Sequence, residues 1–298
     1  MATDTTTTIE LAVEMTCQKC VNETSNVLSK DPSVIDYKIS LPKKSVIVES
    51  TLPSSELIRL IEEGTGKRAV IMGGSGQNQD DTKSSAAVAM LGGIIGCGGT
   101  VQGVIRFMQK KDSGVCVIDG TIDGLTPGPH GLAIHECGDL SQGCESVGGH
   151  YNPRNSRHGS PTDEERHVGD LGNIHADGSG RALFKFSDRL VKVEDIIGRS
   201  VVVSQDADDF GKGRSTNSIV NGNCGKLLSC GIIARSSGLF ENSKRICACD
   251  GVKTPFDDAL DIILKIFLSR CLFGTKETNH WLGQEDKTNC NMPFTSGK

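Results

Sequence analysis

The sequence predicts a multidomain chain in which a small α+β domain is followed by an all-β domain and a long tail. Three observations support this prediction. The chain of 298 residues exceeds the usual size of one domain. Residues 9–72 alternate between strand and helix patterns, whereas residues 86–237 contain short strand patterns separated by glycine-rich turns. A polar segment rich in Gly and Ser, residues 75–85, lies between them and is typical of a linker.

The first domain, residues 1–74, shows the order β-α-β-β-α-β, which is typical of a ferredoxin-like fold. The clearest helix pattern covers residues 53–64, with Leu57, Leu60 and Ile61 on one face. We expect Ser54 to be its N-cap and Gly64 to end it. The strand patterns are at residues 9–15, 34–41, 45–49 and 68–72.

Residues 86–237 predict an antiparallel Greek-key barrel or sandwich. The strand patterns there include residues 100–109, 115–124, 130–138, 181–188, 199–206 and 230–237. Residues 238–298 form an extended tail with a possible helix at 255–273, in which Asp261, Lys265 and Arg270 argue against a membrane span. That helix could pack on the β domain or mediate association, or it could be an appendage without a shared role.

The composition narrows the class of protein and its compartment. A net charge of -5 and the lack of any run of Lys or Arg argue against nucleic-acid binding and favour ions or soluble proteins as partners. The first ten residues lack the pattern of a secretory signal, so we expect a cytoplasmic protein. In that reducing compartment the twelve cysteines are more often metal ligands, redox thiols or core residues than a disulfide framework.

Two cysteines in "MTCQKC", Cys17 and Cys20, open the first helix. A helix N-terminus favours the thiolate form, and two thiolates without a third Cys or His suit Cu(I) better than tetrahedral zinc. A redox pair or two structural cysteines are the alternatives.

A second cluster lies on one long loop, which carries His150, His158, His167 and Asp170. Three imidazoles and a carboxylate would complete a four-coordinate Zn(II) site with no open position, which is a structural arrangement. The alternative is that these are solvated loop histidines.

The segments "HGLAIHECGD", "DADDFGKG" and "CGIIARSSGLF" resemble the Cu,Zn superoxide dismutases. With "MTCQKC" before them and "ICACD" after them, the chain to about residue 251 resembles the copper chaperones for superoxide dismutase. The resemblance implies a heavy-metal-associated domain, a dismutase-like domain and a protein that delivers copper to the dismutase and oxidises its disulfide. It also implies a copper donor such as a membrane copper transporter, and a location that could include the mitochondrial intermembrane space.

The resemblance also implies roles for single residues. Two copper ligands of the dismutase are replaced by Ala133 and Ser204, which leaves His135 and His150, whereas the zinc quartet is complete and Asp208 matches a carboxylate that supports a zinc histidine. The substrate-guiding arginine of the dismutase falls at Leu227. We therefore expect no dismutase activity, although an enzyme with accessory metal-binding ends, or a copper store or sensor, remain alternatives.

Two further cysteine pairs have expected roles. The dismutase disulfide corresponds to Cys144 and Cys230, with two buried free thiols as the alternative; its closure would contribute roughly 3 to 4 kcal/mol. The pair Cys247 and Cys249 is too closely spaced for a relaxed disulfide, so we expect a transient Cu(I) site and a labile disulfide that passes to the client. The alternative is that these two tail cysteines have no functional role. We take Cys97, Cys116, Cys137 and Cys224 to be ordinary core or loop residues.

The last implication is the partner surface. The dismutase dimer surface matches residues 138–144, 197–199, Ile232 and Ile233, where we expect a heterodimer with Cu,Zn superoxide dismutase. Because an isologous surface is self-complementary, we also expect a homodimer when no client is present.

Overall fold

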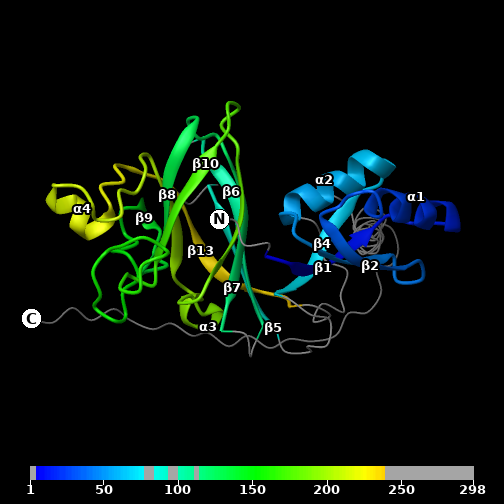
Figure 1. Ribbon diagram of the computed structural model, residues 1–298, viewed down its shortest axis with the longest axis horizontal. Coiled ribbons are helices and arrows are strands. Elements are labelled where there is room, and N and C mark those ends of the chain that lie inside the picture. The colour runs from blue at the N-terminus through cyan, green and yellow to red at the C-terminus, as the bar shows by residue number, and fades with distance from the viewer. Residues whose placement is uncertain (1–4, 77–83, 93–99, 111–113, 239–298) are drawn as a thin grey trace, which may run out of the picture. The chain divides into compact units, whose positions relative to one another are not determined.

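The computed structural model describes residues 5–76, 84–92, 100–110 and 114–238, which belong to one compact unit, residues 1–246. Figure 1 shows these segments in colour. The Cys247 and Cys249 pair, Cys97, most of the linker and the possible helix at 255–273 lie outside the described residues. No helix among the described residues is long and apolar enough to cross a membrane.

The N-terminal domain has the ferredoxin-like fold that the sequence predicts (Figure 1). Its sheet is antiparallel with the order β2-β3-β1-β4, and the apolar faces of two helices pack against it around Leu11, Met15, Leu28 and Leu57. The elements are β1 (Thr7–Val13), α1 (Gln18–Leu28), β2 (Val34–Ser40), β3 (Ser45–Ser50), α2 (Ser54–Thr65) and β4 (Ala69–Gly76).

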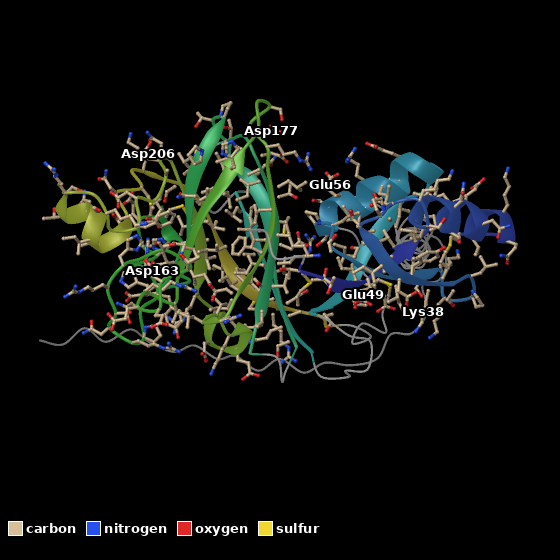
Figure 2. The ribbon with its side chains drawn as sticks, viewed as in Figure 1. Lys38, Glu49, Glu56, Asp163, Asp177 and Asp206 are labelled. Carbon is tan, nitrogen blue, oxygen red and sulfur yellow. A yellow bond between two sulfur atoms is a disulfide. The ribbon has the colours of Figure 1, made fainter. Side chains whose placement is uncertain are left out.

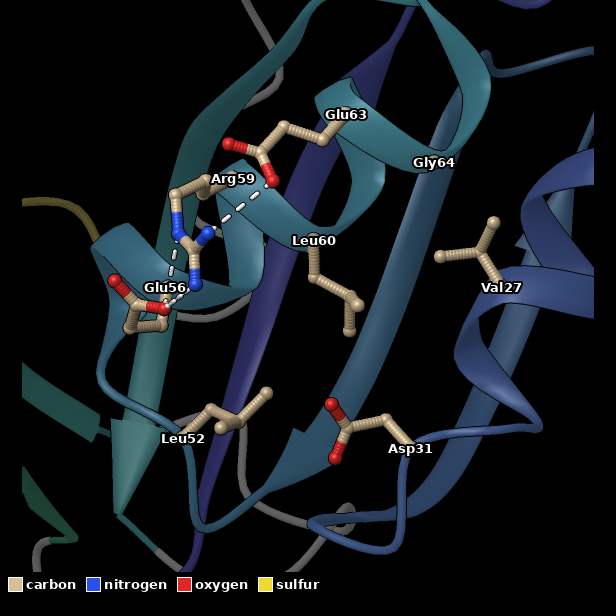
Figure 3. A pocket seen from close by; sticks show the side chains of 8 residues that line it. All are labelled: Val27, Asp31, Leu52, Glu56, Arg59, Leu60, Glu63 and Gly64. Carbon is tan, nitrogen blue, oxygen red and sulfur yellow. Dashed lines mark hydrogen bonds and ion pairs between the residues drawn. The ribbon is translucent and has the colours of Figure 1, made fainter.

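The ends of α2 differ from the prediction. Pro53 is the N-cap and Ser54 is the first helical residue, while Gly66 ends the helix at φ 66°. Gly64 serves packing instead, because a Cβ there would lie 2.6 Å from Cγ2 of Val27 on α1. Beside this contact a groove of about 410 Å³ runs between the helices, and Arg59 pairs with Glu56 and Glu63 along its edge (Figure 3).

The second domain is a closed eight-stranded antiparallel barrel, which confirms the predicted fold class. The strand order is β10-β11-β7-β6-β5-β13-β12-β8, and β8 pairs with β10 to close it. Strands distant in sequence, such as β5 and β13, are neighbours, as Greek-key connections require. The strands are β5 (Ser84–Leu91), β6 (Gln102–Lys110), β7 (Cys116–Asp123), β8 (Gly128–His135), β10 (Asp170–Ala176), β11 (Ala182–Asp188), β12 (Ser200–Ser204) and β13 (Leu227–Ser236).

Alternate residues of these strands point inward, and Ile105, Phe107, Ile118 and Val201 are among the side chains buried in the barrel core. Figure 2 draws the side chains of the described residues on the ribbon. Three small elements lie outside the barrel: β9 (Ser141–Cys144), α3 (Val193–Ile196) and α4 (Thr216–Asn221). The long loop 145–169 follows β9, and the loop 205–226 joins β12 to β13. These two loops carry the three candidate zinc histidines and their supporting carboxylate, Asp208, and the fourth candidate ligand, Asp170, begins β10.

Candidate metal centres and docking surface

The four predicted zinc ligands come together beside the start of β10. The candidate ligand atoms of His150, His158, His167 and Asp170 all lie within 4.8 Å of one another. Three ring nitrogens surround one oxygen, Asp170 Oδ1, at 2.8 Å from His150 Nδ1, 3.0 Å from His158 Nδ1 and 3.1 Å from His167 Nδ1. Residues up to 20 positions apart therefore form one four-ligand cluster.

Backbone hydrogen bonds fix the orientation of the Asp170 carboxylate. Its second oxygen, Oδ2, accepts hydrogen bonds from the backbone N–H groups of Gly159, at 3.1 Å, and His167, at 2.9 Å. Burial opposes ionisation, but the three histidines beside the carboxylate hold the pKa of Asp170 well below its ordinary value. The carboxylate therefore presents a charged Oδ1 toward the histidines.

The environment of His158 fits a metal ligand. Its Nε2 lies 2.8 Å from Asp208 Oδ1, which favours the tautomer with the proton on Nε2. Its Nδ1 is buried and has no hydrogen-bond partner, although it faces Asp170. Burial opposes a positive charge on His158, but Asp170 and Asp208 raise its pKa to about 9, so the position between the two carboxylates favours a cation. Three nitrogens with one oxygen suit zinc. His150, His158, His167 and Asp170 would hold the ion, which would join loop 145–169 to β10.

His135 and His150, the two histidines that match copper ligands of the dismutase, lie close together. His135 and His150 lie with their ring centroids 5.1 Å apart, and His135 Nδ1 lies 2.8 Å from the carbonyl oxygen of Gly148. Burial, and secondarily His150, lowers the pKa of His135 to about 4, so this ring is neutral. Ala133 and Ser204 offer no nitrogen ligand. The two histidines are thus half of the four-ligand set that the resemblance implies.

The two cysteines of the N-terminal domain meet at the start of α1. Their sulfur atoms are 3.5 Å apart, with Cys17 exposed at the N-cap and Cys20 nearly covered. Hydrogen bonds from the backbone and hydroxyl of Thr16, followed by one from the backbone of Cys17, lower the pKa of Cys20 to about 6. A thiolate is therefore present at neutral pH, as Cu(I) binding requires.

We expect the Cys20 thiol of the metal-free protein to lose its proton near pH 6, because its thiolate is the better hydrogen-bond acceptor. The pH dependence of its ¹³Cβ chemical shift measures this midpoint directly. The variant Thr16→Val removes the hydroxyl and should raise the midpoint. A wild-type midpoint near 9, or the same midpoint in the variant, would contradict this assignment.

Cys144 and Cys230 form a disulfide with a Cα–Cα distance of 5.8 Å. It joins β9 to β13 beside Val147 and Val202 and anchors the turn that precedes β9. Ser200 supports the same turn by donating a hydrogen bond from Oγ to the carbonyl oxygen of Cys137. Cys116 and Cys224 are buried, and burial raises the pKa of both thiols, that of Cys224 to about 12. Cys137 is exposed.

An exposed apolar patch lies next to this disulfide. Ile197 is 41 % exposed and Ile232 is 43 % exposed, whereas the neighbouring Ile233 is completely buried and cannot contact a partner as expected. Sequence reasoning missed Met90, which is 59 % exposed; the register that pairs Ile233 with Ala89 places it opposite Ile232. The period-two alternation of β13 could have shown that only one of the two isoleucines faces outward.

Arg199 holds the segments around this patch. Its Nη1 donates to the carbonyl oxygen of Glu136 at 2.7 Å, its Nε donates to that of Asp195 at 2.8 Å, and its guanidinium stacks 3.8 Å from the ring of Tyr151. A Cβ on Gly138 would collide with the carbonyl oxygen of Gly198, so the two loops approach closely. The patch, defined here as Met90, Ile197 and Ile232, therefore adjoins segments that these contacts hold together.

Comparison with known proteins gives two domain families. A heavy-metal-associated domain matches residues 10–68, and a copper/zinc superoxide dismutase domain matches residues 101–233. The superoxide dismutase [Cu-Zn] A of Xenopus laevis is 49% identical over 150 residues, which are 49% of this chain and 95% of that protein. A solved structure, that of the clock protein EA4, is 39% identical, covers 53% of this chain and 99% of its own, and has a TM-score of 0.47. The two family matches thus place the chain in a class of proteins that join a heavy-metal-associated domain to a copper/zinc superoxide dismutase domain.

Relatives that match most of the chain give the particular family. The copper chaperone for superoxide dismutase of Homo sapiens is 50% identical over 246 residues, 82% of this chain and 86% of that protein. The corresponding protein of Rattus norvegicus is 49% identical over 245 residues, 82% of this chain and 86% of its own. The chain belongs to the family of copper chaperones for superoxide dismutase.

Proposed function

We propose that this protein takes up Cu(I) through Cys17 and Cys20, docks on Cu,Zn superoxide dismutase, and passes copper and a disulfide to it through Cys247 and Cys249. The observation that carries the proposal is a dismutase-like barrel with its zinc quartet present, two copper ligands replaced, and an exposed apolar patch. Such a barrel keeps the shape of a dismutase subunit without its catalytic metal site. A domain of this kind is suited to recognising another subunit.

The patch supports docking through a two-fold arrangement. Exposed apolar side chains beside a disulfide-anchored turn give a desolvated centre, and the surrounding loops supply a polar rim. Because a two-fold contact uses the same surface on both partners, the patch would also pair two copies of this chain. Copper would come from a donor such as a membrane copper transporter. A dismutase with accessory metal-binding ends is the second candidate, and Ala133 and Ser204 argue against it.

Docking should weaken about tenfold or more when Ile232 is changed to Glu, because a charge would then be buried at the centre of the contact. Sedimentation of the copper-loaded chain with zinc-loaded, disulfide-reduced dismutase measures the heterodimer. Activation of the dismutase at limiting chain concentration should fall in parallel.

The matched control is Ile219→Glu, which places the same charge at an exposed apolar position of α4, away from the patch. It should dock and activate normally, and both variants should keep their zinc and copper. Unchanged affinity of Ile232→Glu would refute the docking surface. Superoxide turnover by the fully metal-loaded chain alone would favour the second candidate.

A further inference from the structure

A row of three charged side chains crosses the outer face of three neighbouring barrel strands. The strand register pairs Arg106 of β6 with Asp119 of β7, and Asp119 with Lys185 of β11. The alternating neighbours of these residues, such as Ile105, Phe107 and Ile118, fill the barrel. Arg106, Asp119 and Lys185, which we call the charged row, therefore point outward with a negative charge between two positive ones.

The charged row is covered although it faces outward. Asp119 is only 1 % exposed, and Arg106 and Lys185 are partly buried. Burial raises the pKa of Asp119, which the two cations oppose, and burial lowers the pKa of Lys185 to about 8, which Asp119 opposes. Charges that are removed from water in this way are costly unless each has partners.

Residues of the N-terminal domain supply partners to Asp119 and Lys185. The Asp119 carboxylate accepts a hydrogen bond from the backbone N–H of Ser54, at 2.9 Å, where α2 begins. Lys185 Nζ donates three hydrogen bonds, to Thr7 Oγ1 at 2.8 Å and to the carbonyl oxygens of Ser50 and Leu52 at 3.0 Å each. All three protons of the ammonium group therefore have acceptors.

The contact between the N-terminal domain and the charged row is complementary in charge as well as in geometry. The start of a helix carries a partial positive charge and faces a carboxylate, while backbone carbonyl oxygens face an ammonium group. Ser55 Oγ also lies 2.6 Å from Thr121 Oγ1, two residues beyond Asp119 on the same outward side of β7. A contact formed only by chance would not be expected to satisfy both Asp119 and Lys185.

We propose that the charged row is a docking site for the segment 50–55 of the chain's own N-terminal domain. Docking there holds the domain that carries Cys17 and Cys20 to the barrel that carries the partner-binding patch, so the two domains move together. Neither copper transfer nor recognition of dismutase enters this inference, so it can fail or succeed independently of the proposed function.

The test compares the motion of the two domains in the full-length chain. Amide ¹⁵N relaxation should give the same rotational correlation time for residues 5–76 and for the barrel of the wild-type protein. In the double variant Asp119→Asn with Lys185→Met, the correlation time of the N-terminal domain should become shorter than that of the barrel. Its Cys17 and Cys20 should still bind Cu(I), which shows that the domain remains folded.

A second variant avoids any change to the barrel. Ser55→Glu places a carboxylate in the first turn of α2, where it favours the helix, but directs like charge toward Asp119. It should also separate the two correlation times, whereas the control Lys192→Met with Glu194→Gln, at exposed positions outside the row, should not. Separate correlation times in the wild type, or a common value in both test variants, would overturn the proposal.

Discussion

Replacing Asp170 with Asn should remove zinc from the barrel domain and lower its thermal unfolding temperature by about 10 °C. Asp170 Oδ1 is the atom on which the three histidine nitrogens converge, so the substitution removes both a ligand and the only negative charge of the quartet. A ligand present at a thousand times its dissociation constant stabilises the folded state by about 4 kcal/mol. For a domain of this size, each kcal/mol shifts the midpoint by about 2–4 °C.

The measurement must separate this site from the cysteines, which also bind zinc. Zinc X-ray absorption does so, because zinc–nitrogen distances of about 2.0 Å differ from zinc–sulfur distances of about 2.3 Å. The control Glu164→Gln removes an exposed carboxylate from the same loop and should leave zinc and stability unchanged. Full retention of nitrogen-coordinated zinc by Asp170→Asn would show that the quartet is wrongly assigned.

The double variant Cys247→Ser with Cys249→Ser should fail to form the client disulfide and should not activate the dismutase. In the proposed exchange, one client thiolate attacks the Cys247–Cys249 disulfide and forms a mixed disulfide, and the second client thiolate then displaces the chaperone cysteine. The client loses two electrons and the chaperone gains them as a dithiol. One oxidised chaperone therefore oxidises one client. The close spacing of the two cysteines favours transfer because a strained disulfide is easily reduced.

The matched control is Cys271→Ser with Cys290→Ser, which removes the same number of thiols from the C-terminal tail. This control should transfer normally, and both variants should still dock and bind Cu(I) through Cys17 and Cys20. Thiol alkylation followed by mass spectrometry measures the client disulfide, and dismutase activity measures copper delivery. Normal transfer by the Cys247 and Cys249 variant would place the working thiols elsewhere.

Local patterns predicted the elements of the fold well but misplaced the start of α2. Ser54 has the composition of an N-cap, yet its backbone N–H binds Asp119, which lies 65 positions later in the sequence, and its side chain makes no cap. Capping rules use only neighbouring residues, so they could not include this contact. Gly64 similarly looked like a helix end, but its role is to let α1 approach.

One candidate site could be predicted from neighbouring residues in the sequence, and another could not. His150, His158, His167 and Asp170 could be grouped from the sequence because all lie on one loop and its following strand. The charged row could not, since Arg106, Asp119 and Lys185 each look like an ordinary outward residue of a strand. Only the register of three strands aligns them, and only the folded N-terminal domain explains why they are covered.

Closure of the barrel determines how it can recognise other molecules. Every barrel strand has a neighbour on both sides, so among the described residues only the facing sides of β10 and β11, which pair at one position, resemble a sheet edge. Association must then depend on the shape and charge of side chains, which single substitutions can alter, and it cannot extend from subunit to subunit as a continuous sheet. The weakest point is the seam between β10 and β11, which pair at Ala176 and Ala182 alone. Separation of β10 from β11 would expose two unpaired edge strands, which can pair with other chains and aggregate. The pairing at this seam therefore protects the barrel against aggregation.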